Sequence, residues 1–154
     1  MPFWGHARAA GMEMFTFGRR LPALVGTPRE IGEFGLHLQC PWRIRTADVI
    51  LVGSGDLFVP ADATLDYDEY DWDEHESLRD ARLAALVPDD GDVPVVSAVE
   101  GDNVGGARIA LGEAMALELF PNDSDDGEYG EYWRLLPYDA AHFVVSASGA
   151  SWGG

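Results

Sequence analysis

The sequence predicts an α+β domain, with a mainly antiparallel sheet of about six or seven strands and one principal helix on one face. Short segments of alternating apolar residues indicate the strands, and one segment with helical spacing indicates the helix. With 154 residues, 47% of them hydrophobic, the chain can form one domain with its own core. We expect a poorly determined N-terminal extension at 1–20, a single domain at 21–149 with an acidic insertion at 56–92, and a flexible tail at 150–154.

The strongest alternation lies between Phe34 and Arg45. Every second side chain there is apolar and most are large: Phe34, Leu36, Leu38, Cys40, Trp42 and Ile44. This pattern predicts one long, half-buried strand. Because proline cannot donate to a ladder, we expect a sheet edge or a bulge at Pro41. The single cysteine shares the apolar face, so we interpret Cys40 as a packing residue and not as a nucleophile.

The other elements follow from turn and periodicity signals. A turn at 46–48 and the strand 49–53 complete a hairpin, and the segment "SLRDARLAALVP" (77–88) predicts the helix, which Pro88 ends. Further strands are predicted at 93–101, 107–112, 114–120, 132–136 and 142–148.

Charge restricts the classes of partner. The chain has 27 Asp and Glu against ten Arg and no Lys, a net charge of −17. Such a surface repels nucleic acids and anionic membranes, and attracts basic proteins. There is no run of about 20 apolar residues that could span a membrane. A single cysteine fits a reducing, cytoplasmic location.

The segment "DYDEYDWDEHE" (66–76) is the main candidate binding surface, with seven acids in eleven positions. Tyr and Trp between the acids are residue types enriched at interface hot spots. We therefore predict that this segment binds a basic protein, with five acids supplying charge and two aromatic residues acting as anchors. These residues are Asp66, Asp68, Asp71, Asp73 and Glu74, with Tyr70 and Trp72. The alternative is that the acids only keep a loop soluble while its aromatic residues pack into the core.

A second candidate is a small-anion site on the polar face of the long strand. His37, Arg43 and Arg45 lie there, and Arg134 of "EYWRLL" joins them if that strand pairs nearby. The alternative is that these arginines pair with the protein's own carboxylates. We predict no catalytic residue, cofactor or metal site, because no zinc spacing, phosphate loop or nucleophile motif is present. Self-association through a strand edge near Pro41 is a third possibility.

Four stretches carry a resemblance to a known class: "GEFGLHLQCPWRI", "VGSGD", "LELFPNDSDDGEYGEYWRL" and "HFVVSASG". They are similar to small bacterial domains of unknown function, of actinobacterial type, with a Trp-Arg strand and a terminal "hfVV" strand. The resemblance covers residues 32–149 and implies an antiparallel α+β domain without an assigned activity. By class analogy, some small acidic bacterial proteins are immunity proteins that neutralise basic toxins. We therefore expect a non-enzymatic interaction protein, an immunity-type or regulatory partner of a basic protein.

Overall fold

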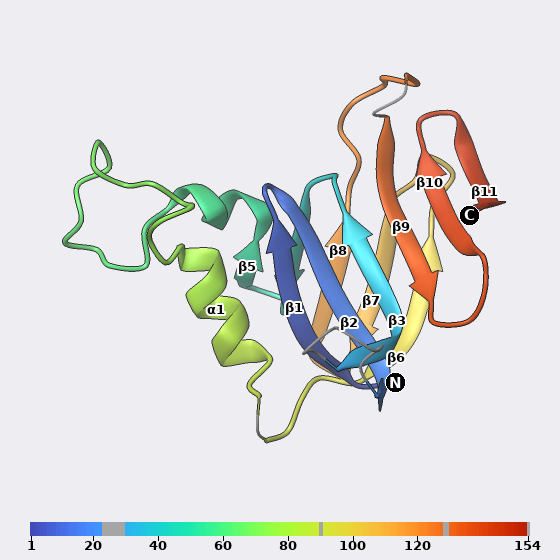
Figure 1. Ribbon diagram of the computed structural model, residues 1–154, viewed down its shortest axis with the longest axis horizontal. Helices are drawn as coiled ribbons and strands as arrows, with labels where there is room; N and C mark the ends of the chain where they lie inside the picture. Colours follow the sequence, from blue (N-terminus) through green and yellow to red (C-terminus); the bar gives the residue numbers. More distant parts are fainter. Residues whose placement is uncertain (23–29, 90, 128–129, 154) are drawn as a thin grey trace.

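Two antiparallel sheets face each other in the computed structural model, which describes residues 1–22, 30–89, 91–127 and 130–153 (Figure 1). The six-stranded sheet has the order β1 (Phe3–Ala9), β2 (Met12–Leu21), β3 (Ile31–Leu38), β9 (Glu131–Pro137), β10 (His142–Ser146) and β11 (Gly149–Gly153). The five-stranded sheet has the order β5 (Ile50–Gly53), β4 (Trp42–Arg45), β8 (Met115–Leu119), β7 (Ala107–Leu111) and β6 (Val96–Gly101). A 3₁₀ helix, η1 (Ser54–Phe58), and one α-helix, α1 (Leu78–Leu86), connect β5 to β6.

The predicted α+β fold is wrong. The described residues form eleven strands in two sheets, with one α-helix of nine residues. The core lies between the two sheets: Phe15 of β2 meets Trp42 of β4 edge to face, with ring centroids 5.0 Å apart. Alternation identifies a half-buried strand, but it does not reveal how many sheets share the strands.

The two ends of the chain also differ from the expectation. Residues expected to form an N-terminal extension make up β1 and most of β2, and Phe3, Phe15 and Phe17 are core residues. The alternation in β2 is interrupted because Glu13 occupies a buried position in line with Phe15 and Phe17. Residues 150–153, expected to form a flexible tail, lie in β11 and pair with β10. The six-stranded sheet is therefore built from both ends of the chain.

The predicted long strand at 34–45 is two strands in different sheets. Its apolar face is confirmed, because Leu36, Leu38, Cys40, Trp42 and Ile44 are all buried. Between β3 and β4 the N–H groups of Gln39 and Cys40 both donate to the carbonyl of Tyr132, at 2.9 and 3.0 Å. Because β3 and β4 are interior strands of their sheets, the edge expected at Pro41 is wrong. Proline is tolerated there because it lies in the link, outside either ladder.

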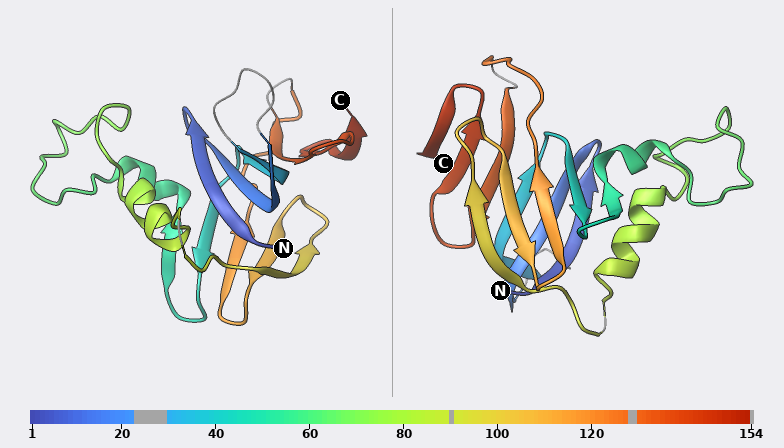
Figure 2. Two further views of the ribbon diagram at one scale, coloured as in Figure 1. Left: turned by 60° about the horizontal axis from the view of Figure 1, so that its bottom comes forward. Right: turned by 180° about the vertical axis from the view of Figure 1, so that it is seen from behind.

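The predicted hairpin and helix are confirmed as β4–β5 and α1. Ser77 caps α1 by accepting a hydrogen bond from the N–H of Asp80, and the helix packs over the side of the sandwich between β1 and β5, where Leu83 and Val87 are buried (Figures 1 and 2). On the other side, where β6 and β11 lie, no helix of the described residues covers the opening (Figure 2). No described helix is long and apolar enough to cross a membrane.

Candidate functional site: the acidic loop and its anchor on α1

Residues 61–76, here called the acidic loop, project from the body of the protein between η1 and α1 (Figure 1). The base of the loop is closed by backbone contacts. The N–H of Ala61 donates to the carbonyl of Glu76 at 3.0 Å, and the N–H of Leu78 donates to that of Val59 at 2.7 Å. A compact loop whose ends lie close together is a frequent form of functional surface loop.

Three aspartates give the acidic loop its shape. Asp62 accepts a hydrogen bond from the N–H of Thr64 at 2.8 Å. In the same way Asp66 accepts from Asp68 at 3.0 Å, and Asp71 from Asp73 at 2.9 Å. Aspartate favours such turns because its short side chain reaches the backbone two residues ahead. The loop therefore holds its carboxylates in defined positions.

Both predicted aromatic anchors, Tyr70 and Trp72, contact the body of the protein. The hydroxyl of Tyr70 donates to the carbonyl of Leu57 at 2.7 Å. The guanidinium of Arg8 lies 5.2 Å from the ring centroid of Trp72, and its Nη2 donates to the carbonyl of Trp72 at 2.5 Å. Tyr70 and Trp72 thus hold the loop against the body of the protein, although both side chains are half-buried and neither belongs to the core. The aromatic residue that faces solvent is Tyr67, which is 65% exposed.

All five predicted acids are exposed: Asp66, Asp68, Asp71, Asp73 and Glu74. Asp73 pairs with Arg8 at 3.3 Å. Within the described residues, the other four make no ion pair, so their charge is directed to solvent.

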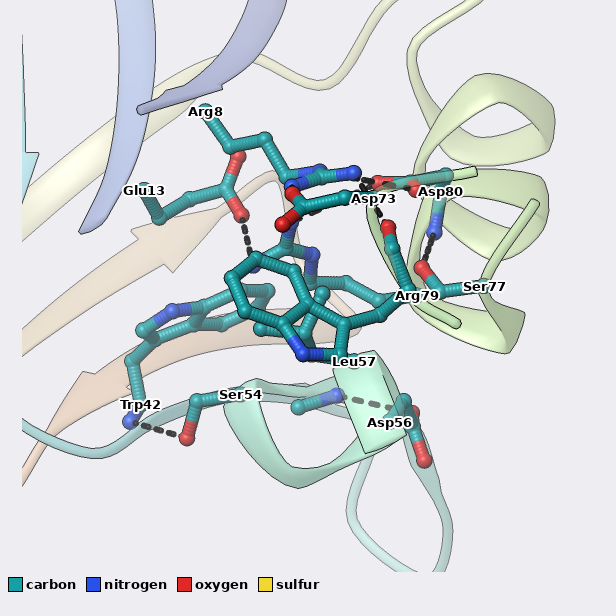
Figure 3. Close-up of polar contacts among 12 residues, drawn as sticks. Arg8, Glu13, Trp42, Ser54, Asp56, Leu57, Asp73, Ser77, Arg79 and Asp80 are labelled. Carbon is teal, nitrogen blue, oxygen red and sulfur yellow. Dashed lines mark hydrogen bonds and ion pairs between the residues drawn. The ribbon is translucent and has the colours of Figure 1, made fainter. Parts of the chain in front are cut away.

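A polar cluster joins α1 to the six-stranded sheet beneath the acidic loop (Figure 3). Glu13 of β2 and its cross-strand neighbour Arg8 of β1 meet Arg79 and Asp80 of α1. Arg79 Nη1 lies 3.1 Å from Glu13 Oε2, and both side chains are only 1% exposed. Asp80 lies 3.5 Å from Arg79 and 3.8 Å from Arg8. We call Arg8, Glu13, Arg79 and Asp80 the anchor cluster.

The Glu13–Arg79 pair is costly to bury. Burial raises the pKa of Glu13 to about 8, although the nearby Arg79 lowers it. Neither Glu13 Oε2 nor Arg79 Nε makes a hydrogen bond within the described residues. The burial of Glu13 and Arg79 was not predicted from the sequence, although the sequence does indicate the burial of Arg79. Arg79 precedes Leu83 by four residues and therefore lies on the buried face of the helix.

The four residues of the predicted anion site do not converge. Arg43 Nε and Arg45 Nε both donate to Glu118, each at 2.8 Å, and these two arginines lower the pKa of Glu118 to about 2. In the other sheet Arg134 Nη2 lies 2.6 Å from Glu131 Oε2, and His37 is the cross-strand neighbour of Arg134. Arg43, Arg45 and Arg134 therefore pair with the protein's own carboxylates, which was the alternative to an anion site.

Arginine charge is neutralised in this way throughout the described residues. Eight of their nine arginines lie within ion-pair distance of an acid: Arg8, Arg19, Arg20, Arg43, Arg45, Arg79, Arg82 and Arg134. The unpaired acids therefore dominate the field outside the protein.

Burial governs the chemistry of the single cysteine. Cys40 is buried, as predicted, and burial raises the pKa of its thiol to about 11, so the thiolate is scarce at neutral pH. In the described part of the chain, no group of three His, Cys, Asp or Glu side chains could hold a metal ion.

Comparisons with protein families, with curated proteins and with solved structures found no match.

Proposed function

We propose that this protein is a non-enzymatic interaction protein whose acidic loop binds a basic partner protein. The supporting observation is that the loop directs Asp66, Asp68, Asp71 and Glu74 to solvent while Tyr70 and Trp72 fix it to the body. An immunity-type or regulatory role would use such a surface. A cytoplasmic location belongs to the same proposal, since it rests on the single cysteine.

A preformed loop favours binding for two physical reasons. Turns made by Asp62, Asp66 and Asp71 order the backbone before the partner arrives, so less conformational entropy is lost on association. Uncompensated carboxylates also attract a basic partner over distance, which raises association rates by roughly 10–1000-fold at low salt. Tyr67 replaces Tyr70 and Trp72 as the aromatic residue available to the partner.

Charge neutralisation of the loop tests this proposal. The loop variant combines D66N, D68N, E69Q and E74Q, and asparagine at position 66 keeps an oxygen for the turn. A matched control removes four exposed charges elsewhere with D48N, D92N, E113Q and D139N. The readout is affinity for a polylysine probe by calorimetry, at about 50 mM and about 500 mM salt.

We expect the loop variant to bind at least about tenfold more weakly than the control at low salt, and binding by the wild type to weaken at high salt. Equal losses in the loop variant and the control would assign the binding to net charge and overturn the proposal. So would a wild-type affinity that does not change with salt. Self-association stays a prediction, although not through an edge at Pro41, and light scattering at high protein concentration tests it.

A further inference from the structure

The side of the sandwich opposite α1 exposes a row of aromatic rings. Trp133, Phe143 and Trp152 lie on the adjacent strands β9, β10 and β11, with successive ring centroids 5.8 and 5.0 Å apart. Trp152 is 63% exposed. Val99 of β6 belongs to the inner face of the other sheet, since it pairs with the buried Ile109, yet it is 64% exposed. Six strands face five, so the inner faces at this side are incompletely covered.

An apolar cleft lies between the two sheets at this side. Its volume is about 300 Å³, and its lining is apolar, including Val96, Val99, Ile109, Trp133, Leu135 and Phe143. A cleft of this size accommodates roughly one or two large apolar side chains.

Among the described residues, β6 is the edge strand of the five-stranded sheet, so one side of its backbone lacks a partner strand over Val99–Gly101. Across its hairpin, the N–H of Asp102 donates to the carbonyl of Gly106. Alternate residues of a strand direct their N–H and C=O groups to opposite sides. The backbone N–H and C=O of Glu100 therefore point toward β7. The backbone N–H and C=O of Val99 and Gly101 point away from β7, toward the open edge. These two residues offer two donors and two acceptors to an added strand.

The beginning of the same edge already carries a short antiparallel pairing. Pro2 bridges Val95, the N–H of Val96 donates to the carbonyl of Met1 at 2.7 Å, and the N–H of Phe3 donates to that of Pro94 at 2.8 Å. The edge is therefore able to hold an extended segment. The existing pairing stops short of Val99, and the apolar cleft lies beside the part that is left free.

The charges near the open side indicate which kind of peptide segment can bind there. Four acids, here called the acidic rim, are exposed and make no ion pair among the described residues: Glu100, Asp102, Asp123 and Asp126. Three of them line a neighbouring hollow of about 600 Å³ that also reaches Trp133 and Phe143. A second copy of this chain would bring the same acids, so charge complementarity favours a basic occupant.

We propose that this open side binds an extended peptide segment of a partner, in which apolar residues alternate with Arg or Lys. The segment pairs with Val99 and Gly101 as an added strand of the five-stranded sheet. Its apolar side chains enter the cleft beside Trp133 and Phe143, and its basic side chains meet the acidic rim. This site goes beyond the function proposed above, because it lies on the side of the sandwich away from α1 and the acidic loop (Figure 2).

The test uses a synthetic peptide of about seven residues in which Val and Arg alternate. Binding is measured by calorimetry and by amide hydrogen exchange, using the loop variant described above so that the acidic loop contributes less to binding. We expect slower exchange at Val99 and Gly101. V99R in the same protein should weaken binding at least about tenfold. The matched control V49R changes a valine of similar exposure, 58%, in the β4–β5 turn and should leave binding unchanged.

Results of three kinds would overturn the proposal. The first is a failure of the strand pairing, seen either as equal affinity of V99R and V49R or as unchanged exchange at Val99 and Gly101. The second is equal binding of a peptide in which Glu replaces Arg, which would remove the charge argument. The third is a dimer in light scattering that V99R converts to monomer, since it would assign the edge to a second copy. Because V99R and V49R are compared in the same loop variant, a failure of this test leaves the function proposed for the loop intact.

Discussion

Replacement of Glu13 by Gln tests whether burial keeps this carboxyl protonated. Its pKa is raised from 4.5 to about 8, so above pH 4.5 the folded protein binds a proton that the unfolded chain has released. The contribution of Glu13 to stability is therefore full below about pH 4.5 and is lost as pH rises through about 8. By linkage, the wild type should lose about 2 kcal/mol of unfolding free energy between about pH 6 and about pH 8 through this group alone. Glutamine resembles the protonated carboxyl and carries no such dependence.

The assay is urea unfolding of both proteins at several pH values between about 6 and 9. The stability of E13Q relative to the wild type should rise by about 2 kcal/mol over the first two pH units. His6, whose pKa is lowered mainly by burial, is present in both proteins and largely cancels in the difference. E33Q serves as a control, because Arg19 lowers the pKa of Glu33 and confines its effect to acid pH. A stability difference between E13Q and wild type that does not change with pH would show that Glu13 is ionised throughout, and would contradict its raised pKa.

Three further predictions concern other buried or paired groups. Arg79→Met leaves the protonated Glu13 carboxyl and the partly exposed Asp80 without their buried partner, and should lower the unfolding free energy by about 1–3 kcal/mol in urea at neutral pH; an unchanged unfolding free energy would contradict the role of the anchor cluster. Arginine neighbours lower the pKa of Glu118 to about 2 from 4.5, so its stabilisation is present above about pH 4.5 and disappears as pH falls toward 2. E118Q should therefore flatten the acid-unfolding curve in that range, and an unchanged curve would argue against the pairing. Cys40 should react with iodoacetamide at neutral pH only after denaturation, and rapid labelling of the folded protein would disprove its burial.

The local features of the fold could be predicted from the sequence, because each depends on neighbouring residues. Alternation identified the buried set from Leu36 to Ile44, and helical spacing before Pro88 identified α1. The division of 34–45 between two sheets could not be predicted. It depends on Tyr132, whose carbonyl holds the link between β3 and β4 from about ninety residues away.

The candidate site was predictable in its charge but not in its orientation. The density of Asp and Glu between residues 66 and 76 identified the acids of the loop, and the five predicted binding acids are exposed. The direction of Trp72 depends on Arg8, and that of Tyr70 on the carbonyl of Leu57. Glu13 could not be recognised as buried, because a charged residue in line with Phe15 and Phe17 interrupts the apolar pattern and its partner Arg79 lies far away in the sequence.

The pairing of β3 with β9 has a consequence for synthesis on the ribosome. These strands meet through pairs such as Leu38 with Trp133, although about ninety residues separate them. At a translation rate of about 5–20 residues per second, β3 waits roughly 5–20 s for its neighbour. During that interval a strand that is central in the finished sheet is an open edge in the nascent chain, where it can pair with other chains. The β4, β7 and β8 strands are complete before β9 is made, so the five-stranded sheet can form first and serve as the template on which the six-stranded sheet closes.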